Sequence, residues 1–509
     1  MATRSSAEGV KVRILSGTDD IRPEVGPDTP LRIAVLGDFS GRRTRGIAGS
    51  GDQSSTRRVY QIDRDNCSEV LSRLEVELRI PVLAQKAPPL VIRFADLDDF
   101  HPDRLVETVE IFDALKDTKK SLKDPAVLAA LENQLSSASR SAEPSLAPSG
   151  SQSTGNLLQQ ILDASEDRSP VEVSPSPSDI DDFVRQTVKP YSVPKARPTQ
   201  TELSAKLDEA IGELLRKILH HPDFQALEAA WRGVHFLVSQ IETNENLKLY
   251  LIDVSKAELA ADLSAKDDIS AAEIYGLLSK TAEETGDSEP WSLLAGDFTF
   301  DNTSDDAALL SGLSKLAKAV GAPFIAAAHT HLLGCDSLAE TPDPDDWELP
   351  ADESTHNAWD DLRKLPEAGY IGLVLPRFLL RLPYGKETEP IERFEFEEVE
   401  PVPKHEEYLW GNPCYACVYL IAQAFSQNGW NFRPGMIQEI GGLPLHVYKD
   451  QGESRVKPCA ETMLTQRAAE AILDRGLMPL LSFVNRDNIR LARFQSIADP
   501  PRPLKGRWV

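Results

Sequence analysis

The sequence predicts an α/β fold of mixed β-sheets flanked by helices, with a disordered linker between two folded regions. Short apolar runs of strand length alternate with helix-period segments over residues 247–375, the pattern of a mostly parallel sheet. A stretch rich in Ser and Pro separates them from an N-terminal region with strands and helices of its own. A hydrophobic share of 41% over 509 residues is sufficient for sizeable cores.

The N-terminal region, residues 1–135, combines both kinds of element. Residues 10–15 (VKVRIL) alternate apolar and charged side chains, as a half-exposed strand does, and residues 31–37 (LRIAVLG) form a buried apolar run. Gly, Ser and Arg dominate the connection after the second strand. We expect strands at 10–15, 31–37 and 90–94, helices after a cap at Asp65 or Asn66 and over 105–115, and a mobile loop over 42–58.

Residues 136–198 differ in kind, because Ser, Pro, Ala and Asp dominate them. Such a segment cannot bury enough apolar surface to offset its ordering entropy, so we predict a disordered linker. Two helical islands interrupt it, at 155–165 and 180–188. An amphipathic island of this kind is either a partner-docking motif or a helix that fringes the next domain. The apolar stripe of the second island consists of Ile180, Phe183, Val184 and Val188.

The third region, residues 199–509, is the large folded part. Pro222 ends a first long helix, and apolar runs then alternate with helices in β-α-β order. Acidic stretches at 336–361 and 386–407 are predicted to be solvated loops or faces. We expect helices over 201–220, 224–241, 269–285 and 306–320, and strands over 247–254, 291–298, 323–329 and 370–376.

The charge narrows the classes of partner. The chain carries 55 Lys+Arg against 80 Asp+Glu, a net of −25, which argues against nucleic acid and against an anionic membrane surface. We find no apolar run near the roughly 18 residues that a bilayer span needs and no apolar leader at the start. An odd number of Cys, five in 509 residues, fits a reducing compartment better than a disulfide framework. We therefore expect a cytoplasmic protein without membrane insertion.

Three patterns invite a chemical interpretation, and each has a plainer alternative. His329 and His331, with His356 further on, could be metal ligands, but the spacing favours structural or surface histidines. Cys414 and Cys417 form a CxxC, yet no second pair completes a zinc site. Their apolar surroundings favour thiols packed on one helix face, with no role beyond packing.

The glycine-containing run at 36–43 (LGDFSGRR) follows a predicted strand but lacks both the P-loop and the GxGxxG spacing. An acidic residue at its centre, Asp38, would repel phosphate. Neither GxSxG nor HExxH occurs in the chain. We predict no catalytic residue, no cofactor and no metal site, and hence no enzyme.

Longer strings in the third region are more specific. They are 221–237 (HPDFQALEAAWRGVHFL), 294–298 (LAGDF), 322–328 (APFIAAA), 372–385 (GLVLPRFLLRLPYG), 395–398 (EFEE) and 408–412 (YLWGN). In this order they resemble the large subunit of the type VI secretion system contractile sheath, across most of residues 200–500. The first region resembles the small sheath subunit through 32–42 (RIAVLGDFSGR), 62–66 (IDRDN) and 92–103 (IRFADLDDFHPD). The two subunits, normally separate chains, are here expected to be fused through the linker.

The resemblance implies a mechanical function. Family members form tight heterodimers that stack around an inner tube, and contraction of the sheath drives the tube outward. The implied partners are sheath subunits (the chain itself or its paralogues), an inner tube protein, baseplate proteins and an AAA+ disassembly ATPase. Family rows are stitched by exchanged strands, which implies this role for Val10, Val12 and Ile14. The ATPase grips a short helix of the large subunit, which implies docking through Ile180, Phe183, Val184 and Val188.

The resemblance also has a departure. Residues 475–498 resemble the last segment of the large subunit, where family members continue into an Arg-rich helix and a stitching strand. We therefore expect the C-terminal stitching arm to be absent after Val509. The preferred hypothesis is a self-assembling or co-assembling sheath subunit. The alternatives are a sheath-derived adaptor, cap or baseplate-proximal component, and a metal-dependent hydrolase using His329 and His331.

Overall fold

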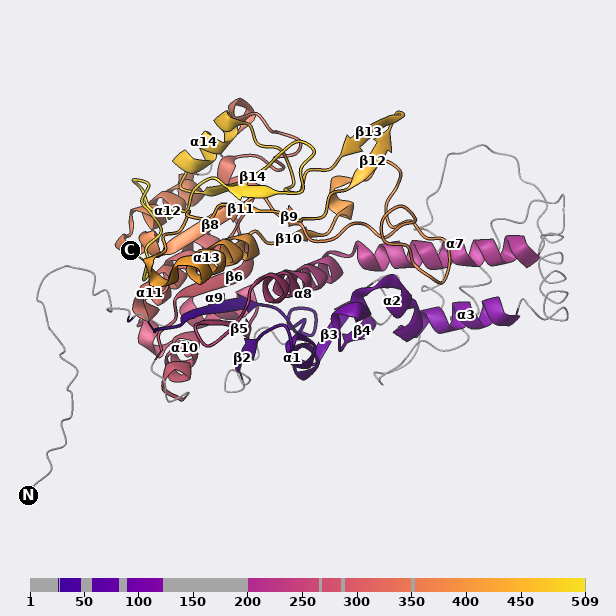
Figure 1. Ribbon diagram of the computed structural model, residues 1–509, viewed down its shortest axis with the longest axis horizontal. Helices are drawn as coiled ribbons and strands as arrows, with labels where there is room; N and C mark the ends of the chain where they lie inside the picture. Colours follow the sequence, from indigo (N-terminus) through magenta and orange to yellow (C-terminus); the bar gives the residue numbers. More distant parts are fainter. Residues whose placement is uncertain are drawn as a thin grey trace, which may run out of the picture.

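The computed structural model describes residues 26, 28–46, 57–81, 89–121, 200–264, 268–284, 289–348 and 353–508. Its largest element is a nine-stranded mixed sheet with the order β11-β15-β14-β8-β7-β6-β1-β5-β2 (Figure 1). The six strands from β14 to β5 run parallel, and antiparallel strands close both edges. The strands are β1 (Leu31–Gly37), β2 (Val59–Ile62), β5 (Leu247–Asp253), β6 (Leu293–Phe300), β7 (Phe324–Ala328), β8 (Ile371–Leu375), β11 (Glu439–Ile440), β14 (Met478–Ser482) and β15 (Ile489–Leu491).

Strand β1 lies between two strands from the other side of the undescribed segment 122–199. It pairs in parallel with β5, where Leu31 is opposite Leu247, and with β6, where Ile33 is opposite Leu293. Strand β2 extends the same sheet beyond β5. Consequently the N-terminal region and the large C-terminal region share one continuous sheet.

Both faces of this sheet are covered by helices, because its central strands are apolar on both sides. Alternate residues of β1 enter two separate cores, Ile33 and Val35 one core, Ala34 and Leu36 the other. The first core is covered by α1 (Cys67–Arg73), α2 (Pro102–Thr108), α8 (Pro222–Gln240) and α13 (Cys414–Asn428). The second is covered by α9 (Lys256–Ser264), α10 (Glu273–Glu284), α11 (Ser304–Val320), α12 (Glu353–Lys364) and α14 (Gln466–Asp474).

Two helices project from this body as a pair, α3 (Ile111–Ser121) and α7 (Gln200–Leu219) (Figure 1). Lys119 of α3 forms an ion pair with Asp208 of α7. Their outer ends border residues 122–199, so the predicted linker and both of its helical islands lie outside the described residues.

Three two-stranded sheets complete the described architecture. They are β3 (Val76–Ile80) with β4 (Leu90–Phe94), β9 (Phe378–Leu379) with β10 (Trp410–Gly411), and β12 (Val447–Asp450) with β13 (Glu453–Val456). The β12–β13 hairpin projects from the body (Figure 1). Its turn residues Gln451 and Gly452 both have positive φ, 49° and 86°, as the tightest hairpin turns require. Short 3₁₀ helices are η2 (Leu97–Phe100), η4 (Ile269–Ala271), η5 (Thr330–Leu333), η6 (Pro344–Asp346), η7 (Pro366–Tyr370), η8 (His405–Glu407) and η9 (Gly429–Asn431).

The predicted α/β class is confirmed, as are the strands at 31–37 and 90–94 and those of the third region. The helix expected over 105–115 is wrong in one respect, because it is divided into α2 and α3. Val109 adopts an extended backbone (φ −88°, ψ 118°) and buries its side chain, which ends α2 before Ile111 starts α3. Asn66 stands at the predicted cap of α1, but its side chain accepts the N–H of Asp63 instead.

Three surface predictions are also corrected. The acidic stretch 336–361 contains the beginning of α12, whose Trp359 is buried. In the stretch 386–407, Glu398 is 1% exposed, because an arginine from another segment neutralises it. Arg42, expected in a mobile loop, is held by two carboxylates. The helix expected over 269–285 begins as η4 and becomes α-helical at Glu273.

Candidate functional site

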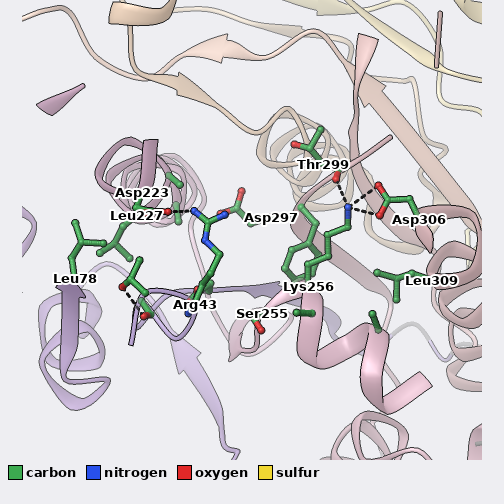
Figure 2. A pocket seen from close by; sticks show the side chains of 18 of the residues that line it. Arg43, Leu78, Asp223, Leu227, Ser255, Lys256, Asp297, Thr299, Asp306 and Leu309 are labelled. Carbon is green, nitrogen blue, oxygen red and sulfur yellow. Dashed lines mark hydrogen bonds and ion pairs between the residues drawn. The ribbon is translucent and has the colours of Figure 1, made fainter. Parts of the chain in front are cut away.

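The carboxyl ends of β1, β5 and β6 open onto a cavity of about 620 Å³ (Figure 2). Ligands of open α/β sheets bind at this edge, where neighbouring connections leave in different directions. The chain achieves this here by inserting β1 between β5 and β6. A bulge in β6 between Gly296 and Thr299 places Asp297 in the cavity lining.

The cavity is acidic, and its two cations are already paired. Arg43 forms an ion pair with Asp223. The Lys256 Nζ donates to the carbonyl of Thr299 and to Asp306, both at 2.7 Å. Burial raises the pKa of Asp297 to about 7, partly opposed by hydrogen bonds from side chains of α13 and the residues before it. The ionisable groups of this cavity that are not cations are therefore all carboxyl groups, and they outnumber its two cations.

The loop after β1 is closed by carboxylates of the chain itself. Asp38 accepts the backbone N–H groups of Arg42 at 2.6 Å and Arg43 at 2.9 Å. Asp253 accepts those of Phe39 at 2.9 Å and Ser40 at 3.0 Å. The amide donors that a bound phosphate would require are thus used internally.

The same loop joins the N-terminal region to the body. The guanidinium of Arg42 donates to Glu258 at 2.9 and 2.7 Å and lies 3.3 Å from Asp253. Burial opposes ionisation of Glu258, but the hydrogen bonds of Arg42 and of Ser255 outweigh it and lower its pKa to about 2. In addition, the indole N–H of Trp231 donates to the Phe39 carbonyl at 2.8 Å. The ion pairs of Arg42 and the buried hydrogen bond of Trp231 therefore hold the loop after β1 against the body.

A second buried charge network lies between α8 and the segment after β9. Arg381 donates to Glu228 at 2.7 and 3.1 Å and to Glu398 at 2.7 and 3.0 Å. Arg232 adds a 2.7 Å bond to Glu228, and the Tyr384 N–H adds one to Glu398. Burial raises the pKa of Glu398, but the attraction of Arg381 and hydrogen bonds outweigh it, lowering the value to about 2. We call these five residues the Arg381 network.

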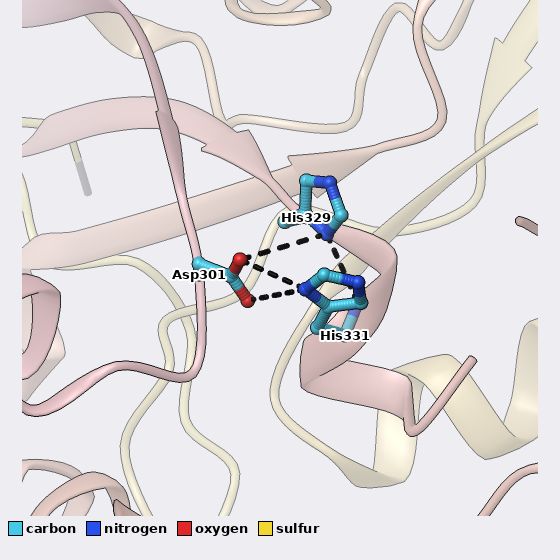
Figure 3. Close-up of side chains that lie close together, drawn as sticks. All are labelled: Asp301, His329 and His331. Carbon is cyan, nitrogen blue, oxygen red and sulfur yellow. Dashed lines mark hydrogen bonds and ion pairs between the residues drawn. The ribbon is translucent and has the colours of Figure 1, made fainter. Parts of the chain in front are cut away.

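Two histidines and an aspartate converge beyond the ends of β6 and β7 (Figure 3). Asp301 directly follows β6, His329 directly follows β7, and His331 belongs to η5. His331 Nδ1 lies 2.8 Å from Asp301 Oδ2, and His329 Nδ1 lies 3.9 Å from the same oxygen. Burial lowers the pKa of His329. We call these three residues the histidine–aspartate cluster.

The cysteine pair lies where the sequence predicted it. Cys414 and Cys417 are one turn apart on α13 and are completely buried. All five cysteines of the chain have free thiols. Burial raises the pKa of both thiols far above the ordinary value, so neither is a thiolate at neutral pH.

The remaining predicted site residues lie outside the described residues. These are the strand-exchange residues Val10, Val12 and Ile14 and the docking residues Ile180, Phe183, Val184 and Val188. The side chain of His356 is likewise outside them. Among the described residues, the third member of the group around His329 and His331 is Asp301, which the sequence did not identify. The usable signal was its position at the end of a strand parallel to the one before His329.

The described helices include none that is both long and apolar enough to cross a membrane. Residues 201–498 match the protein family described as EvpB/VC_A0108, tail sheath N-terminal domain. Residues 5–140 match the family described as Type VI secretion system, VipA, VC_A0107 or Hcp2. The type VI secretion system sheath protein TssC1 of Pseudomonas aeruginosa is 35% identical over 302 residues. That alignment covers 58% of this chain and 61% of the relative.

Proposed function

Because this chain belongs to the family of type VI secretion system sheath proteins, we propose that it is a structural subunit of a contractile sheath. In this role it assembles with copies of itself or with paralogous sheath subunits around an inner tube. Its work is mechanical rather than catalytic. We further propose a cytoplasmic location and contacts with baseplate proteins and an AAA+ disassembly ATPase.

The single observation that carries the proposal is the shared sheet. β1, from the region that matches the small-subunit family, lies between β5 and β6, from the region that matches the large-subunit family. Parallel pairing on both sides of β1 makes the two regions one rigid body. A force-transmitting subunit requires such rigidity, because relative motion of its two parts would absorb the displacement that it must pass on.

The β12–β13 hairpin supports an assembly surface. Among the described strands it pairs with no third strand, and its residues are exposed or half-buried. An isolated two-stranded hairpin is marginally stable in water, and added strands complete its unpaired edges. The predicted strand at 10–15 alternates apolar and basic side chains and is suited to be such an added strand. We propose that the arm of one copy pairs with the hairpin of another.

Electron microscopy of the purified full chain tests the proposal. We expect tubules, rings or rows in negative stain, formed by the chain alone or after addition of a sheath subunit pair. Binding to the added pair without formation of tubules, rings or rows would favour the adaptor or cap. Particles that stay monomeric at high concentration under both conditions would contradict the sheath function altogether.

Proline substitutions test the hairpin edge without removing the hairpin. In an antiparallel ladder, residues alternate between those whose N–H groups face the partner strand and those whose N–H groups face outward. Counted from the two-residue turn, Lys449 and Ser454 face outward. We expect Lys449→Pro or Ser454→Pro to prevent assembly, since one of the two edges loses a donor.

Ser454→Thr is the matched control, because it retains the N–H and suits a strand. A variant lacking residues 1–17 should also fail to assemble, while its circular dichroism and melting temperature stay those of the full chain. If both proline variants assemble like the unmodified chain, the hairpin is not the acceptor. If the shortened variant unfolds, residues 10–15 are part of the core instead.

A further inference from the structure

We propose that the histidine–aspartate cluster binds one divalent first-row transition-metal ion, of the class that includes zinc. This site goes beyond the sheath function and does not depend on it. Two imidazoles and one carboxylate are the ligand set of many such sites, in which the remaining positions hold water. The sequence shows only the His-x-His half of the set, because Asp301 is 28 residues before His329 in the chain.

The ligand atoms already converge on one point. In a tetrahedral site with metal–ligand distances near 2.1 Å, neighbouring ligand atoms are about 3.4 Å apart. The Asp301 Oδ2 lies 2.8 Å from one imidazole nitrogen and 3.9 Å from the other, distances on either side of that value. The two imidazole rings are 4.0 Å apart between centroids, so small side-chain rotations bring all three atoms to a common ion.

Second contacts hold each ligand in place. The other oxygen of Asp301, Oδ1, accepts the backbone N–H of Asn302 at 2.7 Å and lies 3.1 Å from His331 Nδ1, while Oδ2 makes the closer approach to that imidazole at 2.8 Å. The Asn302 amide in turn donates to the His331 carbonyl at 3.2 Å. Metal sites depend on contacts of this kind, because they fix the direction of each ligand before the ion arrives.

His331 shows the arrangement most clearly. Its Nδ1 faces Asp301, while its Nε2 lies 3.2 Å from the carboxylate of Asp336. A metal-bound imidazole commonly donates its other N–H to a carboxylate, which sets the tautomer and strengthens the ligand. The side chain of Asp336 is 98% exposed, so burial against other residues does not account for its position beside this ring.

Access and charge also fit a cation. The side chains of His329 and His331 are 39% and 40% exposed, so an ion can enter from solvent. The two carboxylates beside the imidazoles, Asp301 and Asp336, carry a negative charge that a divalent ion balances. The His329 Nδ1 accepts the backbone N–H of His331 at 3.2 Å, a long hydrogen bond that metal coordination replaces.

Zinc titration of the full chain tests the site, with bound metal measured after dialysis and affinity measured by calorimetry. We expect one equivalent of zinc. Asp301→Asn and His331→Gln should each weaken binding at least about tenfold. His405→Gln is the matched control, because His405 also lies 3.2 Å from a carboxylate, that of Glu461, and should retain the affinity of the unmodified chain.

The visible absorption of bound cobalt reports on metal coordination directly, and a change in folding alone does not produce it. We expect the visible absorption of cobalt bound to the unmodified chain, and its loss in both cluster variants, whose circular dichroism is recorded alongside. If one variant fails to fold, the other still decides. The proposal is overturned if the unmodified chain holds no stoichiometric zinc, or if the folded variant binds zinc as tightly as the unmodified chain does.

Discussion

Replacing Arg381 by Met tests the buried charge network directly. Glu228 and Glu398 are 0% and 1% exposed, and Arg381 contacts both through four hydrogen bonds. With Arg232, the network holds two anions and two cations and is neutral. Arg381→Met leaves two anions against one cation, an uncompensated buried charge. Loss of one partner of a buried pair costs about 3–5 kcal/mol, a large part of the 5–15 kcal/mol that stabilises a typical domain.

Urea unfolding at neutral pH, followed by tryptophan fluorescence, measures this loss. The double variant Arg381→Met with Glu398→Gln should recover about 1–3 kcal/mol, because the remaining pair of Glu228 and Arg232 is neutral. A loss below about 1 kcal/mol in the single variant, or a further loss in the double variant, would refute the reasoning.

The pH dependence supplies an independent check. The pKa of Glu398 is lowered from 4.5 to about 2 in the folded chain. Its contribution is therefore fully present above pH 4.5 and is lost as the pH falls toward 2. The unmodified chain should therefore lose stability as the pH falls from about 4.5 toward 2, and its advantage over Arg381→Met in unfolding free energy should shrink over the same range.

Three further predictions concern other parts of the chain. Gly233→Ala should destabilise by about 1–3 kcal/mol in urea unfolding, because its Cβ would lie 2.3 Å from the buried Tyr415 ring; Gly276→Ala, with open space, should not. Asp297→Asn should raise the melting temperature at pH 8 but not at pH 4. The pKa of Asp297 is raised from 3.8 to about 7, so the unmodified chain loses stability as the pH rises through that range. Equal shifts of the melting temperature at the two pH values would contradict this. Phe183→Ala should weaken binding of the disassembly ATPase to a linker peptide covering residues 176–192, and unchanged affinity would count against docking there.

The local sequence pattern predicted most helices and strands. It could not predict features that depend on contacts between residues far apart in the chain. The strand at 31–37 is identifiable from seven consecutive residues, but its place between β5 and β6 depends on edges more than 200 residues away. Glu398 lies in an acidic stretch that is typical of solvated loops, and its ion pair with Arg381, from outside that stretch, explains its burial. Asp301 belongs to no motif, because its neighbours are brought to it by parallel strand order rather than by spacing.

The position of β1 between β5 and β6 also determines when the central sheet can form during translation. Leu31 leaves the ribosome 216 residues before its partner Leu247, since 247 − 31 = 216. At the usual 5–20 residues per second, the strand waits about 10–40 s for its first neighbour and longer for β6. Throughout that interval a largely apolar segment has both edges free, which favours pairing with other nascent chains. This protein therefore completes its central sheet late in synthesis, and a chaperone that covers the first 40 residues during that interval should raise its yield.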